Sequence, residues 1–230
     1  PYFSHFLKWR TLPELLSMRD RGGLPLLEWG YLVLVTTLVL ALLVSLLLVL
    51  LPLFLTARTR SRLAGPRWRI IAYFSFVGMA FMFIEIAFIQ KFILFLHHPL
   101  YSVSAVLCAF LIFAGLGSLA SGRWHKRFSL FNTSVGIAVL ALAYILLLPD
   151  LFNLLAQLPG MLKTPIAILI IAPLAFLMGM PFPGGLAFVS KRSPAWIPWA
   201  WGINGSASVV SAILATLLAM HLGFDLVVFI

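Results

Sequence analysis

The fold is decided by residues 70–96, which read IIAYFSFVGMAFMFIEIAFIQKFILFL. Glu85 and Lys91 are the charged side chains in this run. A helix that crosses the hydrocarbon core of a bilayer needs about 20 predominantly apolar residues. The stretch therefore predicts a transmembrane helix, because a helix buried in a soluble domain rarely stays apolar for so long.

Similar apolar runs lie on both sides of this stretch. They cover about residues 29–55, 100–121, 131–148, 164–180 and 203–221. Another begins at Phe224 and breaks off within a few residues, so we expect a partial seventh span and a fragment of a longer chain. Residues 29–230 thus predict an all-α polytopic integral membrane protein, a transmembrane helical bundle with about six helices.

The segment 1–28 differs from the rest and predicts an interfacial tail. Thr11 and Glu14 have the spacing of a capping box, which predicts a short helix that ends before Gly22 and Gly23. Its leucines share one face, as in an amphipathic helix on the membrane surface. A linker helix packed on a soluble domain is an equal alternative.

Composition and charge support the membrane assignment. Hydrophobic residues make up 63% of the 230 residues and charged residues 10%, against about 45–50% and 25% in soluble domains. These values exclude a soluble enzyme domain, a disordered regulator and a nucleic-acid-binding module. The expected partners are the lipid bilayer and other membrane subunits, and nucleic acid is not among them.

The 16 Lys and Arg residues, against 6 Asp and Glu, predict an orientation. Basic clusters at 58–69, 123–127 and 191–192 fall on one side if the spans alternate. Short loops rich in Lys and Arg stay in the cytoplasm, so this side is predicted to be cytoplasmic and the N-terminal tail to lie outside. A cysteine at position 60 should then react only with membrane-permeant reagents.

Glu85 is the first candidate functional residue. A charge near the bilayer centre costs about 2.5–3.5 kcal/mol on insertion scales, so the side chain should face the bundle interior. It either binds a proton, a cation or a cationic substrate, or forms a hydrogen bond to a neighbouring helix. For the second role the candidate partners are Asn204, Ser208 and Ser104.

The second candidate is the segment 178–185, MGMPFPGG, together with Asn204. Broken helices line substrate sites in transporters, which makes Gly184, Gly185 and Asn204 candidates for substrate or ion binding. The alternative, which we favour from sequence, is an interfacial loop, because Lys191 and Arg192 place the stretch near the membrane surface.

Small residues recur every four positions on two spans and predict close helix packing. They are Ala114, Ser118 and Gly122 on one span, and Ser208 and Ala212 on the other.

The sequence contains no catalytic motif, so we expect no catalytic residue, no metal site and no cofactor in this chain. The histidines at 97, 98 and 221 are expected near the outer face, exposed to solvent rather than binding a metal.

Two long stretches carry a resemblance. Residues 81–122, FMFIEIAFIQKFILFLHHPLYSVSAVLCAFLIFAGLGSLASG, and 179–224, GMPFPGGLAFVSKRSPAWIPWAWGINGSASVVSAILATLLAMHLGF, resemble the membrane region of bacterial polytopic spermidine-synthase-like proteins. The opening PYFSHFLKW is similar to the segment that leaves the soluble domain of that family.

This resemblance implies a transporter-like membrane half in the bacterial cytoplasmic (inner) membrane. It also implies an upstream adenosyl-binding domain, similar to an aminopropyltransferase or methyltransferase, that would hold any transferase activity. The chain would then bind or move a small cationic substrate. The alternative is a non-catalytic structural or accessory subunit that anchors a larger membrane complex.

Overall fold

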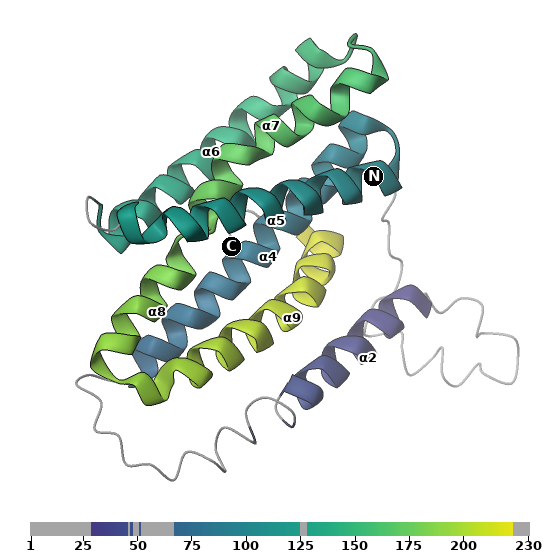
Figure 1. Cartoon of the computed structure of the whole chain (residues 1–230). Coiled ribbons are helices and arrows are strands. Elements are labelled where there is room, and N and C mark those ends of the chain that lie inside the picture. The colour runs from purple at the N-terminus through teal and green to yellow at the C-terminus, as the bar shows by residue number, and fades with distance from the viewer. Residues whose placement is uncertain (1–28, 46, 48–50, 52–66, 125–127, 223–230) are drawn as a thin grey trace, which may run out of the picture.

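The computed structural model describes residues 29–45, 47, 51, 67–124 and 128–222. The described part is helical and contains no strand, so the prediction of an all-α membrane protein is confirmed. The elements in chain order are α2 (Trp29–Val44), α4 (Arg67–Leu96), α5 (Pro99–Trp124), α6 (Leu130–Leu155), α7 (Gly160–Met178), α8 (Pro181–Arg192), a 3-10 turn (Pro194–Trp196) and α9 (Ile197–Leu222) (Figure 1).

Five helical stretches in the described part are long and apolar enough to cross a membrane. They are Trp68–Leu96, Pro99–Trp124, Leu130–Leu155, Gly160–Arg192 and Pro194–Leu218. They coincide with five of the predicted spans. The remaining predicted span, residues 29–55, corresponds to α2, a helix of 16 residues. The tail helix and the partial span from Phe224 lie outside the described residues.

The turn between α4 and α5 is short and has a clear local cause. His97 adopts a positive φ of 58°, a left-handed conformation that commonly ends a helix. Its N–H donates to the carbonyl of Ile93 at 3.0 Å. Pro99 then begins α5, where its missing N–H costs nothing. The two helices therefore return on each other as an antiparallel pair.

The main core joins α4, α5, α6 and α7 and is rich in aromatic side chains. Phe88 of α4 meets Phe110 of α5 edge to face, with ring centroids 5.8 Å apart, and Tyr144 of α6 at 5.5 Å. A second buried cluster joins α4, α8 and α9 through Phe74, Val189 and other residues. In Figure 1, α9 runs beside the lower part of α4, whose upper part crosses α5. These contacts fix the position of α4 along its own axis relative to the neighbouring helices.

The Gly/Pro-rich segment is helical, so the predicted interfacial loop is wrong. α7 ends at Met178, the chain bends at Gly179 and Met180, and α8 begins at Pro181 (Figure 1). A proline in the first turn of a helix replaces an N–H that has no partner there. The prolines of this segment therefore start a new helix instead of preventing one.

Candidate functional site

Glu85 lies in the middle of α4 and is 6% exposed. Within the described part of the chain, its carboxylate has no hydrogen bond and no ion pair. Gly78 and Phe92 lie two turns before and after it, on the same face of the helix. Gly78 contacts α9, and the carbonyl of Phe92 accepts a hydrogen bond from Ser102 Oγ of α5 at 3.1 Å. The carboxylate therefore sits on the strip of α4 that α5 and α9 cover.

None of the three side chains proposed as partners of Glu85 forms a hydrogen bond to it. Asn204 Nδ2 donates to the carbonyl of Phe74 at 3.1 Å. Ser208 Oγ donates to the carbonyl of Asn204 at 2.9 Å and lies 3.5 Å from the carbonyl of Gly78. Ser104 is exposed. The fixed-neighbour interpretation therefore fails for these three residues, because the two α9 side chains bind the backbone of α4 about two to three turns from Glu85.

Gly78 allows this contact between α4 and α9. A Cβ atom added at Gly78 would lie 2.6 Å from the carbonyl oxygen of Asn204 and 2.9 Å from Ser208 Oγ. Such distances are too short for a carbon atom. The absence of a side chain therefore brings polar groups of α9 within reach of the α4 backbone. We call Gly78, Asn204 and Ser208 the α4–α9 clamp.

Gly184 and Gly185 are buried within α8, away from Glu85. A side chain at Gly185 would collide with the ring of Tyr73, whose hydroxyl donates to the carbonyl of Pro181 at 2.7 Å. Tyr73 precedes Glu85 by twelve residues, or about 18 Å of helix. The four residues predicted to bind a substrate or ion thus do not form one site.

The close contact between α5 and α7 uses a different set of small residues from the stripe predicted on α5. A Cβ at Gly117 would overlap the backbone of Phe176 in α7, and one at Gly179 would overlap the backbone of Ala114. Ser118 is exposed, and a Cβ at Gly122 would meet nothing within 4 Å. The close α5–α7 contact therefore uses Ala114 and Gly117. On α9, Ser208 is in the clamp and Ala212 is half-buried.

Two adjoining cavities lie along α4, and sequence reasoning missed both. The larger has a volume of about 770 Å³ and lies between α4 and α6, with the α7–α8 bend as part of its wall. The smaller, of about 240 Å³, is lined by Arg69, Phe188 and Leu130 among others. Tyr73 lines both cavities, and Glu85 lines neither.

The histidine pair at the α4–α5 turn is exposed, as expected. Within the described ranges, no three His, Cys, Asp or Glu side chains come close enough together to hold a metal ion. The side chain of His221 lies outside the described part.

These contacts and cavities define the candidate site by geometry alone. Compared with protein-family models, curated proteins and solved structures, the chain gives no significant match.

Proposed function

We propose that this chain is the membrane-embedded half of a bacterial spermidine-synthase-like protein and binds a small cation at Glu85. The observation that carries the proposal is the burial of this carboxylate without a hydrogen bond or ion pair in the described part. An ionised carboxylate inside a membrane protein needs a counter-charge or polar partner. A bound proton or organic cation would supply it.

The neighbouring side chains suit an organic cation. Phe81 and Phe88 lie about one turn before and after Glu85 on nearby positions of the helix, and both contact Phe110 of α5. Aromatic rings attract cations through the negative charge of their faces. The resemblance to spermidine-synthase-like proteins suggests an amine as the cation. It also suggests the bacterial cytoplasmic membrane. The basic clusters, by their charge, favour an orientation in which those helix ends lie on the cytoplasmic side.

The test is binding of spermidine to the purified protein in nanodiscs, measured by calorimetry. Glu85→Gln should weaken binding at least tenfold, because the amide keeps the shape of the side chain but lacks its charge. Asp150→Asn is the matched control: it removes the other described acid, which is exposed at α6. Equal affinity of the wild-type and Glu85→Gln proteins would refute the proposal.

A second candidate function is that of a structural or accessory subunit. It is favoured by one observation, namely that neither cavity reaches Glu85. In this case Glu85→Gln should leave spermidine binding absent or unchanged and raise thermal stability, since it removes an unpaired buried charge. Co-purification of another membrane protein with the full-length chain would then identify the assembly.

A further inference from the structure

The two adjoining cavities form a groove with regular walls. Val77, Ala80 and Ile84 follow Tyr73 along one face of α4, at spacings of three or four residues. Ser134, Ala138 and Ala141 form the facing stripe of α6. Residues at these spacings share one helix face. Because four of these seven side chains are small, the two helices leave space between them at this level.

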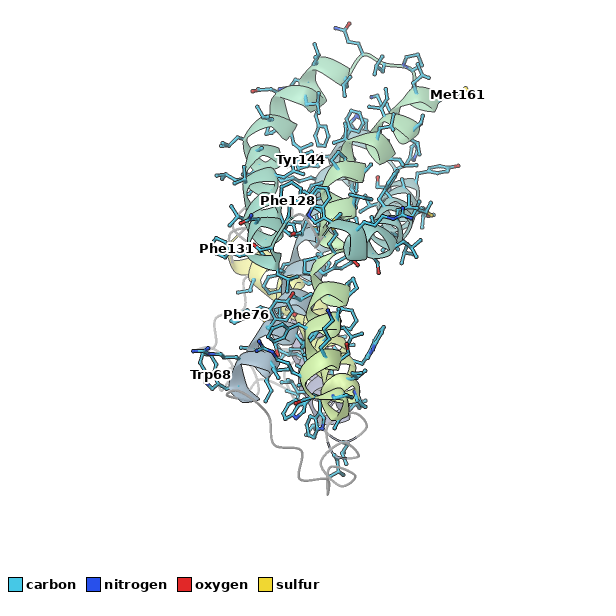
Figure 2. All side chains as sticks on the ribbon, turned by 60° about the vertical axis from the view of Figure 1, so that its left-hand side comes forward. Trp68, Phe76, Phe128, Phe131, Tyr144 and Met161 are labelled. Atoms are coloured by element: carbon cyan, nitrogen blue, oxygen red, sulfur yellow. The ribbon has the colours of Figure 1, made fainter. Side chains whose placement is uncertain are left out.

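The groove has the length of a lipid chain. Arg69 lines its small cavity and Ile84 its large one, and the fifteen residues between them span about 22 Å of helix. Half of a hydrocarbon core is about 15 Å thick. The groove therefore extends from the basic end of α4 across the depth of one leaflet. In Figure 2, Trp68 and Phe76 on α4 and Phe131 on α6 lie along one side of the molecule, and all three are exposed.

The basic end of the groove carries two guanidinium groups. Arg69 lines the small cavity with its apolar atoms, and its guanidinium carbon lies 5.8 Å from the ring centroid of Trp68. The guanidinium carbon of Arg192 lies 4.2 Å from the ring centroid of Phe188, which lines the same cavity. Arginine binds phosphate through paired hydrogen bonds. The acids in the described part of the chain are Glu85 and Asp150, and neither lines this cavity.

We propose that this groove is a binding site for an anionic phospholipid. The phosphate binds at Arg69 and Arg192, and one acyl chain lies between the apolar stripes of α4 and α6. A small cation does not suit the groove, since its walls contain no acid. A second copy of this chain is disfavoured by charge, because the chain carries a net charge of +10. Glu85 itself does not line the groove, although Phe81, one turn before it on α4, lines the large cavity. The proposal does not depend on the function proposed above.

The test uses native mass spectrometry of the purified protein with phosphatidylglycerol or phosphatidylcholine. The wild-type protein should retain one phosphatidylglycerol at least tenfold more strongly than phosphatidylcholine. Arg69→Gln should remove this preference, whereas Arg123→Gln, at the exposed end of α5, should keep it. Soluble glycerol phosphate should not compete, because it lacks the acyl chain.

A second pair of variants tests the apolar walls. Ala138→Trp should fill the large cavity and abolish retention of the lipid. Val139→Trp adds the same side chain at the next position of α6, which is exposed and does not line the cavity, and should have no effect. Both substitutions are at exposed positions.

Any one of the following results would overturn the proposal. The first is equal retention of both lipids by the wild-type protein. The second is loss of retention in Arg123→Gln to the same extent as in Arg69→Gln, or unchanged retention in Ala138→Trp. The third is a wild-type oligomer without bound lipid that Ala138→Trp dissociates, which would show that a second copy occupies the groove. Spermidine binding by the Arg69→Gln protein reports separately on Glu85.

Discussion

The α4–α9 and α5–α7 contacts are both built on glycine, but they hold their helices together differently. At the α4–α9 clamp, the atoms nearest to Gly78 include the polar side-chain atoms of Asn204 and Ser208. At the α5–α7 contact, the atoms nearest to Gly117 and Gly179 are all backbone atoms of Phe176 and Ala114. Membrane helices associate through both close packing and interhelical hydrogen bonds. The clamp combines both, since the backbone oxygen of Asn204 also lies close to Gly78, whereas the atoms at the α5–α7 contact are backbone atoms alone.

The difference determines how each contact should fail. Backbone atoms cannot move aside without displacing the helix, so an added side chain in the α5–α7 contact must push the helices apart. A polar side chain in the clamp can be removed while the helices stay in place. Interhelical hydrogen bonds in membranes contribute about 0.6 kcal/mol on average. The backbone contact should therefore be the more sensitive of the two.

The largest effect is expected for Gly117→Leu. The new side chain would overlap the backbone of Phe176, and overpacking typically costs about 1–3 kcal/mol, with the upper end expected where backbone atoms must move. The midpoint of thermal unfolding in detergent should fall sharply. Gly122→Leu is the matched control on the same helix, where an added carbon meets nothing within 4 Å. If both variants lose stability alike, the backbone contact is not the cause, because leucine favours the helix more than glycine at both positions.

A smaller effect is expected for Asn204→Ala, which removes the hydrogen bond to the carbonyl of Phe74. The unfolding free energy should fall by about 1 kcal/mol, within the range measured for such bonds in membrane proteins. Unfolding of the purified protein by graded denaturant would measure the change. Asn132→Ala, at an exposed position of α6, controls for loss of the amide. A loss equal to that of Gly117→Leu would remove the distinction between the two contacts.

The smallest effect is expected for Ser118→Leu. Ser118 belongs to the stripe predicted from sequence but is exposed beside the α5–α7 contact. Its substitution should change the unfolding free energy by less than about 0.5 kcal/mol, as measured by thermal unfolding. Dissociation of an oligomer by Ser118→Leu, detected by light scattering, would instead support the packing prediction at a subunit interface.

The sequence was sufficient to predict the helical class and most span positions, because span length follows from bilayer thickness. The burial of Glu85 was also predictable, since its charge is costly in lipid. The hydrogen bonds of Asn204 were not, because they depend on how far α9 is displaced along α4. A shift of one turn, about 5.4 Å, would give Asn204 different partners with the same sequence pattern.

The displacement of the α5–α7 contact from the small-residue stripe and the helical form of the α7–α8 segment have related causes. A repeat of four and a repeat of three both place residues on one helix face, so Ala114 was compatible with Ser118 as well as with Gly117. Pro181 and Pro183 were taken as breaks, whereas the first turn of a helix accepts proline. The groove could not be predicted, because its walls come from α4 and α6 and become neighbours only in the folded bundle.

The lengths of two helical segments affect how the protein sits in its bilayer. α4 has 30 residues, about 45 Å of helix, whereas the hydrocarbon core is about 30 Å thick. A helix of this length tilts or thickens the membrane around it. The segment Gly160–Arg192 is longer still, with 33 residues, but it bends at Gly179 and Met180. Because α4 is continuous, we expect its tilt to set the membrane thickness that the protein requires. The α7–α8 segment can fit the same thickness by its bend.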